Sequence, residues 1–262
     1  MTLEVSVNHP RMSSVKHDPL PQEDDIARLF EEYAHRRKHR PNRGLHSLFD
    51  PGDLFMIQQR QRDLLALIKR EGLFPLSDKR ILEIGCAAGG VLLEFLSFGA
   101  TPGFLHGVEM LPWHIKTAQS VTPHLPLVKA DGRYLPFPDG CFDIVMQFTV
   151  FSSILSNDVR RAVADEMRRV LSPNGMILWY DCWINPINPQ TRGIRQSEIR
   201  ELFPGCKYSL RRITLAPPLV RLLAPYSWVA CCLLERLRVF NSHYLAGIKP
   251  QNPLSVCGVA RP

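Results

Sequence analysis

The sequence predicts an α/β protein in which a mainly parallel β-sheet carries helices on both faces. Short apolar segments alternate with helical segments between residues 80 and 180, and such alternation is typical of consecutive βαβ units. A glycine-rich turn follows the first apolar segment and precedes a helix, as in sheets that bind a ligand at one edge. The length of 262 residues, 45% of them hydrophobic, allows one α/β domain with appendages or two small domains.

The N-terminal quarter is predicted to hold a tail and two helices. Residues 1–24 mix proline, histidine, serine and charges without a period, so we expect a flexible tail there. One helix is predicted over 25–39. A second helix follows the Asp50-Pro-Gly-Asp53 turn, with Gly72 as its C-cap. These helices form an N-terminal segment, 25–73, that precedes the sheet domain, 74–262.

The sheet domain is predicted from strands and helices in alternation. Strands are expected at 80–84, 104–109, 125–130, 142–148 and 176–180. Helices are expected at 91–98, near 114–120 and at 157–171, where Pro173-Asn-Gly175 ends the last one. Two further strands, 207–215 and 243–249, show no convincing crossover, so we expect an antiparallel edge pair. Residues 217–240 between them are predicted to form a helical insertion.

The charge of the chain is concentrated in its last quarter. The formal net charge is +7, and residues 192–262 hold eleven Lys or Arg against three Glu. A localised basic surface is suited to phosphates, nucleic acid or anionic lipid headgroups, although a solvated basic face is an equal alternative. A nucleic-acid partner is not favoured, and the oligomeric state is left open.

Cysteine content and hydropathy indicate the compartment. The seven cysteines are odd in number and contain no CxxC pair, so neither a disulfide framework nor a thiolate zinc site is expected, and no metal is predicted. The N-terminus lacks the apolar region of a signal peptide, and the apolar runs at 144–155 and 222–234 are too short to span a bilayer. We expect a cytoplasmic protein, soluble or peripherally attached to a membrane.

Three carboxylates at predicted strand ends distinguish among ligands for the glycine-rich turn. A dinucleotide fingerprint needs a glycine at position 87, which is Ala87. Glu83, two residues before Gly85, would repel a diphosphate and attract an ammonium group. Glu109 ends the second strand and can accept from a ribose diol, and Asp131 after the third can accept from an exocyclic amine. The pattern indicates a cationic ligand that carries ribose and adenine, which NAD fits less well.

Four motifs in this order resemble those of class I S-adenosylmethionine-dependent methyltransferases, and are most similar to the type 11 group. They are Ile-Leu-Glu-Ile-Gly-Cys-Ala-Ala-Gly, Gly-Val-Glu, Ala-Asp-Gly-Arg-Tyr-Leu-Pro-Phe and Cys-Phe-Asp-Ile-Val, within residues 79–181. The resemblance implies a Rossmann-like, doubly wound sheet of seven strands, mainly parallel, with an antiparallel last strand. It also implies S-adenosyl-L-methionine as cofactor and an N-terminal helical lid formed by residues 25–73, to which Tyr33, Arg36 and Arg37 are assigned.

The resemblance also implies the residues that bind the cofactor. The methionine end is assigned to Glu83, Gly85 and Gly89, with Cys86 and Ala87 in the same loop. Glu109 is assigned to the ribose, and Met110 to the adenine ring. The adenine amine is assigned to Asp131 with backbone help from Gly132 and Arg133, and the wall of the methyl-transfer site to Phe148.

The acceptor and the catalytic base are not fixed by the sequence. His114, Tyr180 and Asp181 lie near predicted strand ends and are candidate bases, but no catalytic residue is assigned. Residues 147–153 do not form the Asn/Asp-Pro-Pro-aromatic loop of amino-group methylases, so we expect O-methylation of a small molecule, a sugar or a lipid-linked intermediate, with carbon as the alternative acceptor atom.

Several alternatives remain open. The alternative functions of the protein are those of an NAD(P)-dependent reductase and of an RNA-binding or RNA-methylating protein. The apolar segment 217–240, with its arginines, suits an amphiphilic acceptor at a membrane surface or an ordinary packed insertion. Arg192 and Arg195 either bind a phosphate or carboxylate or face solvent.

Overall fold

The computed structural model describes residues 22–39, 48–185 and 188–251. The predicted tail, 1–24, lies outside this range except for its last three residues, which belong to helix α1 (Gln22–His39). Cys257, one of the seven cysteines, also lies outside it. Within the described residues, no helix is both long and apolar enough to cross a membrane.

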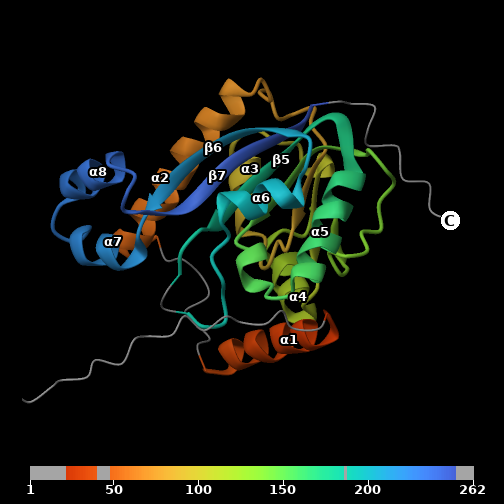
Figure 1. Ribbon diagram of the computed structural model, residues 1–262, viewed down its shortest axis with the longest axis horizontal. Helices are drawn as coiled ribbons and strands as arrows, with labels where there is room; N and C mark the ends of the chain where they lie inside the picture. The colour runs from red at the N-terminus through yellow and green to blue at the C-terminus, as the bar shows by residue number, and fades with distance from the viewer. Residues whose placement is uncertain (1–21, 40–47, 186–187, 252–262) are drawn as a thin grey trace, which may run out of the picture.

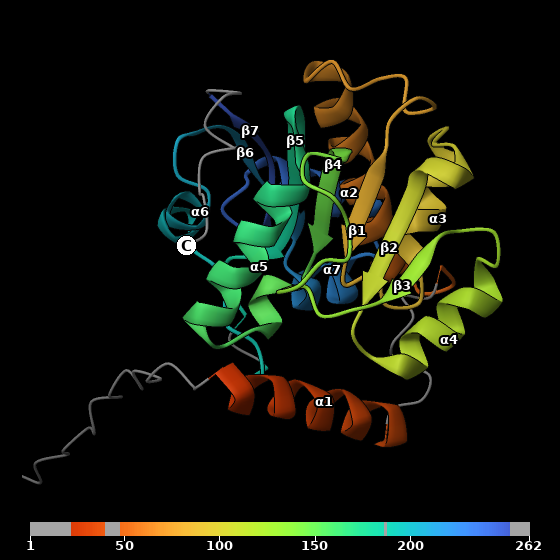
Figure 2. The same cartoon turned by 90° about the vertical axis from the view of Figure 1, so that its right-hand side faces the viewer.

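A single sheet of seven strands forms the centre of the molecule (Figures 1 and 2). The strands are β1 (Ile81–Ile84), β2 (Leu105–Glu109), β3 (Leu127–Lys129), β4 (Phe142–Phe148), β5 (Leu171–Cys182), β6 (Cys206–Leu215) and β7 (Asn241–Pro250). Their order is β3-β2-β1-β4-β5-β7-β6. Strands β1 to β5 pair in parallel, whereas β7 is antiparallel to both β5 and β6. The predicted fold class is confirmed, with β7 inside the sheet and β6 at its edge.

Helices cover both faces of the sheet because the strand side chains alternate between two apolar cores. One core joins Ile84 and Trp179 to Val163 of α5 (Asn157–Val170) and Ile199 of α6 (Gln196–Leu202). The other contains Ile81 and Met146 of the sheet, and its helical members are Leu64 and Leu67 of α2 (Pro51–Arg70) and Leu92 and Phe95 of α3 (Gly90–Ser97). Glu83 lies one residue before Ile84 and therefore faces the side of α2 and α3.

Local signals set several element boundaries as predicted. Asp50 caps α2 by accepting a hydrogen bond from the Asp53 N–H at 2.8 Å, and Pro51 occupies the first turn. Gly72 after this helix has φ +71°, a conformation that favours glycine. The short connections include α4 (Pro112–Val121) and two 3-10 turns, η1 (Pro102–Phe104) and η2 (Phe151–Ser153).

The predicted start of the fifth strand, at residue 176, is wrong. Strand β5 begins at Leu171, directly after α5, because Leu171 pairs with Phe142 of β4. Met176 then pairs with Ile144, so the four residues 172–175 face a single position of β4. The Pro-Asn-Gly segment thus forms an irregularity within the strand pairing instead of a loop before it.

The segment between β6 and β7 forms two helices, α7 (Pro217–Leu223) and α8 (Trp228–Arg236). Their inner face packs on α2 in a small third core that contains Phe55, Val220 and Cys231. Figure 1 shows α7 and α8 projecting beyond the end of α2, away from the main body of the sheet.

Candidate functional site

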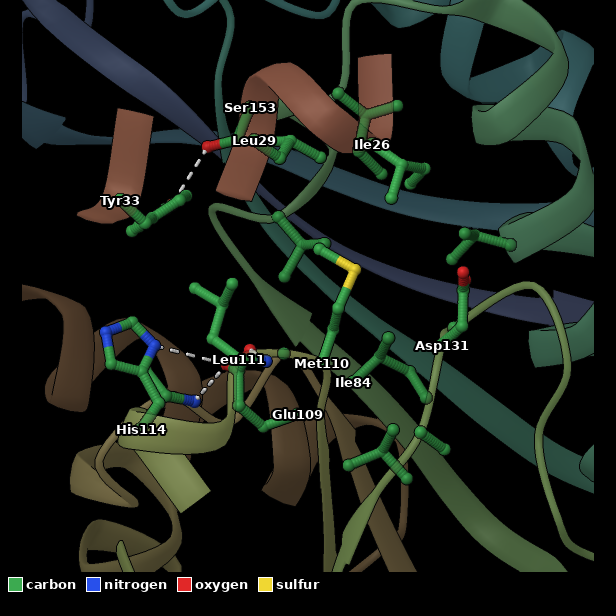
Figure 3. Close-up of a pocket in the computed structure, with 18 of the residues that line it drawn as sticks. Ile26, Leu29, Tyr33, Ile84, Glu109, Met110, Leu111, His114, Asp131 and Ser153 are labelled. Carbon is green, nitrogen blue, oxygen red and sulfur yellow. Dashed lines mark hydrogen bonds and ion pairs between the residues drawn. The ribbon is translucent and has the colours of Figure 1, made fainter. Parts of the chain in front are cut away.

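A pocket opens at the carboxyl edge of the sheet (Figure 3), and α1 lies across this edge (Figure 2). Its empty volume is about 850 Å³, including the open mouth. Side chains of α1 that line it are Ile26, Leu29 and Tyr33. The lining residues at or after the strand ends include Ile84, Gly85, Ala87, Val108, Glu109, Met110, Leu111, Asp131, Gly132 and Phe148.

The glycine-rich turn after β1 is fixed against β2. The N–H groups of Gly85 and Cys86 both donate to the Val108 carbonyl, at 2.8 and 3.0 Å. Gly85 has φ +69°, and a Cβ there would lie 2.6 Å from Cγ2 of Val150. Ala87 also has a positive φ, 44°, so this non-glycine residue is held in the left-handed region. The turn brings the backbone of Gly85 and Ala87 to the pocket wall.

Glu109 occupies the end of β2 and organises the pocket floor. Its side chain is nearly buried, and its two oxygens accept from the Ala87 N–H at 3.0 Å and the Leu111 N–H at 2.8 Å. The Nδ1 atom of His114 lies 3.6 Å from the carboxylate (Figure 3). Because each carboxylate oxygen has a second lone pair, Glu109 is oriented and can still accept from a ligand hydroxyl.

Asp131 lines the opposite side of the pocket and is held by Arg133. The guanidinium donates to both carboxylate oxygens, the shortest distance being 2.7 Å, and this pairing raises the pKa of Arg133. The Arg133 N–H also donates to Asp131, at 2.9 Å. Gly132 lines the pocket, whereas Arg133 is not among the lining residues. The backbone N–H of Arg133, which was predicted to help bind the adenine, therefore donates to the Asp131 carboxylate instead.

Glu83 lies beneath the turn, outside the pocket lining, on the α2 face of the sheet. Burial raises the pKa of its carboxyl well above the usual value, and the nearby Arg60 guanidinium opposes that shift. Within the described residues, the Oε2 atom of Glu83 accepts no hydrogen bond, and the Nε–H group of Arg60 donates none. Arg60 forms an ion pair with Glu94, and its guanidinium lies 5.7 Å from the centre of the Phe148 ring. Sequence reasoning missed Arg60, which is one of several polar residues in 58–62.

Two other residues assigned to the cofactor, Cys86 and Gly89, do not line the pocket. A Cβ on Gly107 would meet the Cys86 Sγ at 2.8 Å, so this buried thiol faces the core beneath the turn. Burial raises the pKa of Cys86 strongly. Gly89 has φ +81° and lies against Thr122 and Ala118 at the end of α4. Of the predicted cofactor residues, the pocket brings together Gly85, Ala87, Glu109, Met110, Asp131, Gly132 and Phe148, and leaves out Glu83, Cys86, Gly89 and Arg133.

Helix α1 is fastened over the pocket by a buried carboxylate. Asp25 is fully buried and accepts from the N–H groups of Leu155 and Ser156, at 2.9 and 2.8 Å. Arg28 pairs with Asp25 at 2.7 Å and donates to the Ser153 carbonyl. The sequence indicated a helix here but not this buried acid.

Among the residues assigned to the lid, Tyr33 alone lines the pocket. Its hydroxyl lies 3.4 Å from the Ser153 hydroxyl. Arg36 instead pairs with Glu32 at 2.6 Å, and Arg37 lies over the Trp113 ring at 5.8 Å.

Of the three candidate bases, His114 lines the pocket and the other two do not. The Tyr180 hydroxyl lies 2.8 Å from the Thr214 hydroxyl in the core. Asp181 is buried and accepts from the N–H groups of Ser152 and Cys182. Arg192 and Arg195 line a separate polar pocket beside α6, where Arg192 pairs with Glu198 at 2.6 Å.

Asp181 gives the stability of the protein a pH dependence that can be measured. Burial raises the pKa of its carboxyl from 3.8 to about 6, so the folded protein holds this proton more tightly than the unfolded chain. Its contribution to stability is present at acidic pH and falls by on the order of 3 kcal/mol between about pH 4 and pH 6. Urea unfolding of Asp181→Asn should lack this fall, whereas Asp165→Asn, at an exposed acid of α5, should retain it.

The fold and the carboxylates at successive strand ends have the arrangement expected of a class I S-adenosylmethionine-dependent methyltransferase domain. Residues 81–175 match a protein family described as a methyltransferase domain. This confirms the predicted class of enzyme and its cofactor, S-adenosylmethionine, and favours them over an NAD(P)-dependent reductase. Assignment to the type 11 group stays a prediction.

Relatives with known names act on different kinds of acceptor. The chain is 32% identical over 106 residues to the sterol 4-C-methyltransferase strm-1 of Caenorhabditis elegans, covering 38% of this chain and 30% of that protein. It is 35% identical to phthiotriol/phenolphthiotriol dimycocerosates methyltransferase 1 of Mycobacterium ulcerans, covering 40% and 38%. It is 28% identical to the human tRNA N(3)-cytidine methyltransferase METTL2B, covering 39% and 29%. The matched segment thus spans about a third of the length of these relatives.

Solved structures support the fold. Phosphoethanolamine N-methyltransferase 2 of Haemonchus contortus, in complex with S-adenosyl-L-methionine, superposes with a TM-score of 0.52. The identity is 19%, and the match covers 72% of this chain and 53% of that one.

Proposed function

We propose that this protein transfers the methyl group of S-adenosylmethionine to an oxygen of an apolar small molecule or lipid-linked intermediate. The observation that carries the proposal is the contrast within the pocket. The two acids of the pocket, Glu109 and Asp131, lie at its sheet edge, whereas much of its outer wall is apolar. That wall contains Ile26, Leu29, Val150, Ile154, Val159 and Val163.

The residues present fit the cofactor at both of its ends. Glu109 is oriented to accept from the ribose hydroxyls, Met110 to pack on the adenine, and Asp131 to accept from its amine. At the methionine end, Glu83 and Arg60 offer a buried acceptor and a buried donor, each with an atom that has no hydrogen-bond partner in the described residues. A carboxyl and a guanidinium are suitable hydrogen-bond partners for an ammonium and a carboxylate. The bound cofactor supplies the methyl group on a sulfonium, and the chain positions the acceptor and excludes water.

His114 is the proposed general base for a hydroxyl acceptor. It lines the pocket, lies 3.6 Å from Glu109 and packs edge-on against Tyr33, with ring centres 5.7 Å apart. A nearby carboxylate orients the imidazole and stabilises its protonated form. Helix α1 is the proposed lid of the methyltransferase domain, because α2 belongs to the sheet core.

His114→Ala should lower kcat about 100-fold, the usual contribution of a general base, while changing S-adenosylhomocysteine affinity less than about threefold. His124→Ala, at an exposed histidine after α4, is the control and should leave both quantities unchanged. Steady-state kinetics and calorimetry measure the two. Unchanged kcat in His114→Ala would remove this residue from the mechanism.

The named relatives supply the acceptor classes for a direct assay. The protein is incubated with S-adenosylmethionine labelled on its methyl group, together with hydroxylated lipids, sterols or tRNA. Label in the lipid fraction, located on oxygen by mass spectrometry of the product, is the expected result. Label in tRNA would replace the lipid acceptor by RNA, and label on carbon would overturn the proposed acceptor atom.

A cytoplasmic location stays a prediction.

A further inference from the structure

The helices α7 and α8 expose a group of large apolar side chains on their outer surface. Leu222 is 64% exposed, Tyr226 86%, Val229 70%, Leu233 59% and Leu237 62%. Isolated exposed apolar residues are common, but a dense group within sixteen consecutive positions, 222–237, marks an interaction site.

The outward face of α8 carries an apolar stripe where an ordinary surface helix is polar. Val229 and Leu233 are four residues apart, and Leu237 follows at the C-cap with the same spacing, so the three share one side. Cys231 on the other side is fully buried against α2. The helix is therefore apolar on both sides, and packing within the described protein explains only the inner one.

The charges around this face are basic. Arg221, Arg236 and Arg238 are exposed. The one acid within 217–240, Glu235, is engaged with Arg62 at 3.0 Å. Tyr226 and Trp228 add aromatic rings with a polar end, a type of side chain enriched where apolar and aqueous phases meet.

We propose that the outer face of α7 and α8 docks on a membrane surface that contains anionic lipids. Apolar side chains flanked by arginines match such a surface, which offers acyl chains beneath negative headgroups. The alternative occupant, a second copy of this chain in a two-fold contact, would place the same arginines against each other. Arg221 is engaged with Asp53 of α2 at 3.4 Å, whereas the described part of the face offers no acid that pairs with Arg236 or Arg238.

The location of the face connects it to the pocket. Strand β6 runs parallel to β1–β5 because β7 is antiparallel to both β5 and β6. It therefore ends at the carboxyl edge of the sheet, where the pocket opens, and α7 begins two residues later. Docking would bring that edge toward the lipid phase. This functional consequence rests on the proposed lipid-borne acceptor, whereas the docking itself does not.

Sedimentation with vesicles tests the docking on the full chain. Vesicles of about 70% phosphatidylcholine and about 30% phosphatidylglycerol are compared with vesicles of phosphatidylcholine alone. Binding to the anionic vesicles should be at least about tenfold stronger, since each arginine at the surface contributes roughly fivefold. The double variant Val229→Asp and Leu233→Asp should lose at least about tenfold in binding to the anionic vesicles.

The matched control places the same change at the opposite edge of the sheet. Phe104 precedes β2 and Val121 ends α4, and both are exposed, so Phe104→Asp with Val121→Asp should bind vesicles as wild type does. Calorimetry with S-adenosylhomocysteine shows that each variant is folded and separates failure of docking from failure of the proposed function. Absent vesicle binding by wild type, equal loss in both double variants, or a dimer abolished by the α8 variant would overturn the proposal.

Discussion

Replacing Glu109 by alanine is expected to weaken the binding of S-adenosylhomocysteine about 100-fold or more. The carboxylate is proposed to accept two ribose hydrogen bonds, and such charge-assisted bonds contribute about 1.5–3 kcal/mol each. The change also leaves the N–H groups of Ala87 and Leu111 without their acceptor, which loosens the turn that forms the pocket wall. Calorimetric titration of the purified variant measures the effect.

Glu166→Ala provides the matched control for this experiment. Glu166 is another buried acid that accepts a backbone N–H, that of Leu135, at 2.8 Å, and it lies outside the pocket lining. Its loss should lower the free energy of unfolding and leave the cofactor affinity unchanged. Equal affinities for wild type and Glu109→Ala would contradict the assigned role of Glu109.

Asp25→Ala is expected to destabilise the protein by about 3 kcal/mol, because it leaves buried N–H groups and Arg28 without their acceptor. The affinity for S-adenosylhomocysteine should fall as well, since α1 supplies one wall of the pocket through Ile26, Leu29 and Tyr33. Urea unfolding and calorimetry measure the two effects.

Asp24→Ala removes the neighbouring charge from the same helical turn without removing a buried contact. Asp24 is exposed, so this variant should match wild type in stability and in affinity. If Asp25→Ala loses stability but binds the cofactor normally, α1 is a structural element and its role as a lid is refuted.

The sequence predicted the sheet and most of its elements because their signals are local. The apolar strands, the Asp50 cap and the amphipathic pattern of α5 each fix an element from neighbouring residues. The start of β5 was missed because it depends on the pairing of Leu171 with Phe142, a contact between distant residues.

The residues of the candidate site could be predicted where sequence motifs contain them, but not where they come from elements that are distant in sequence. Glu109 and Asp131 end consecutive strands, so their positions at the pocket edge follow from strand order. Arg60 and Asp25 lie on helices far from those motifs in sequence. No local pattern shows that Arg60 lies near Glu83, or that Asp25 fastens α1 to the backbone of Leu155 and Ser156. The outward face of α8 was not predictable, because the sequence does not show that Cys231 packs in the core beside α2 and so which side of the helix is buried.

The most direct test of the central claim is calorimetry of the wild-type chain with S-adenosylhomocysteine, compared with NADH. The account predicts one-to-one binding of S-adenosylhomocysteine and no binding of NADH, because Ala87 occupies the position at which a dinucleotide fingerprint needs a glycine. Binding of NADH in place of S-adenosylhomocysteine, or no binding of either, would contradict it.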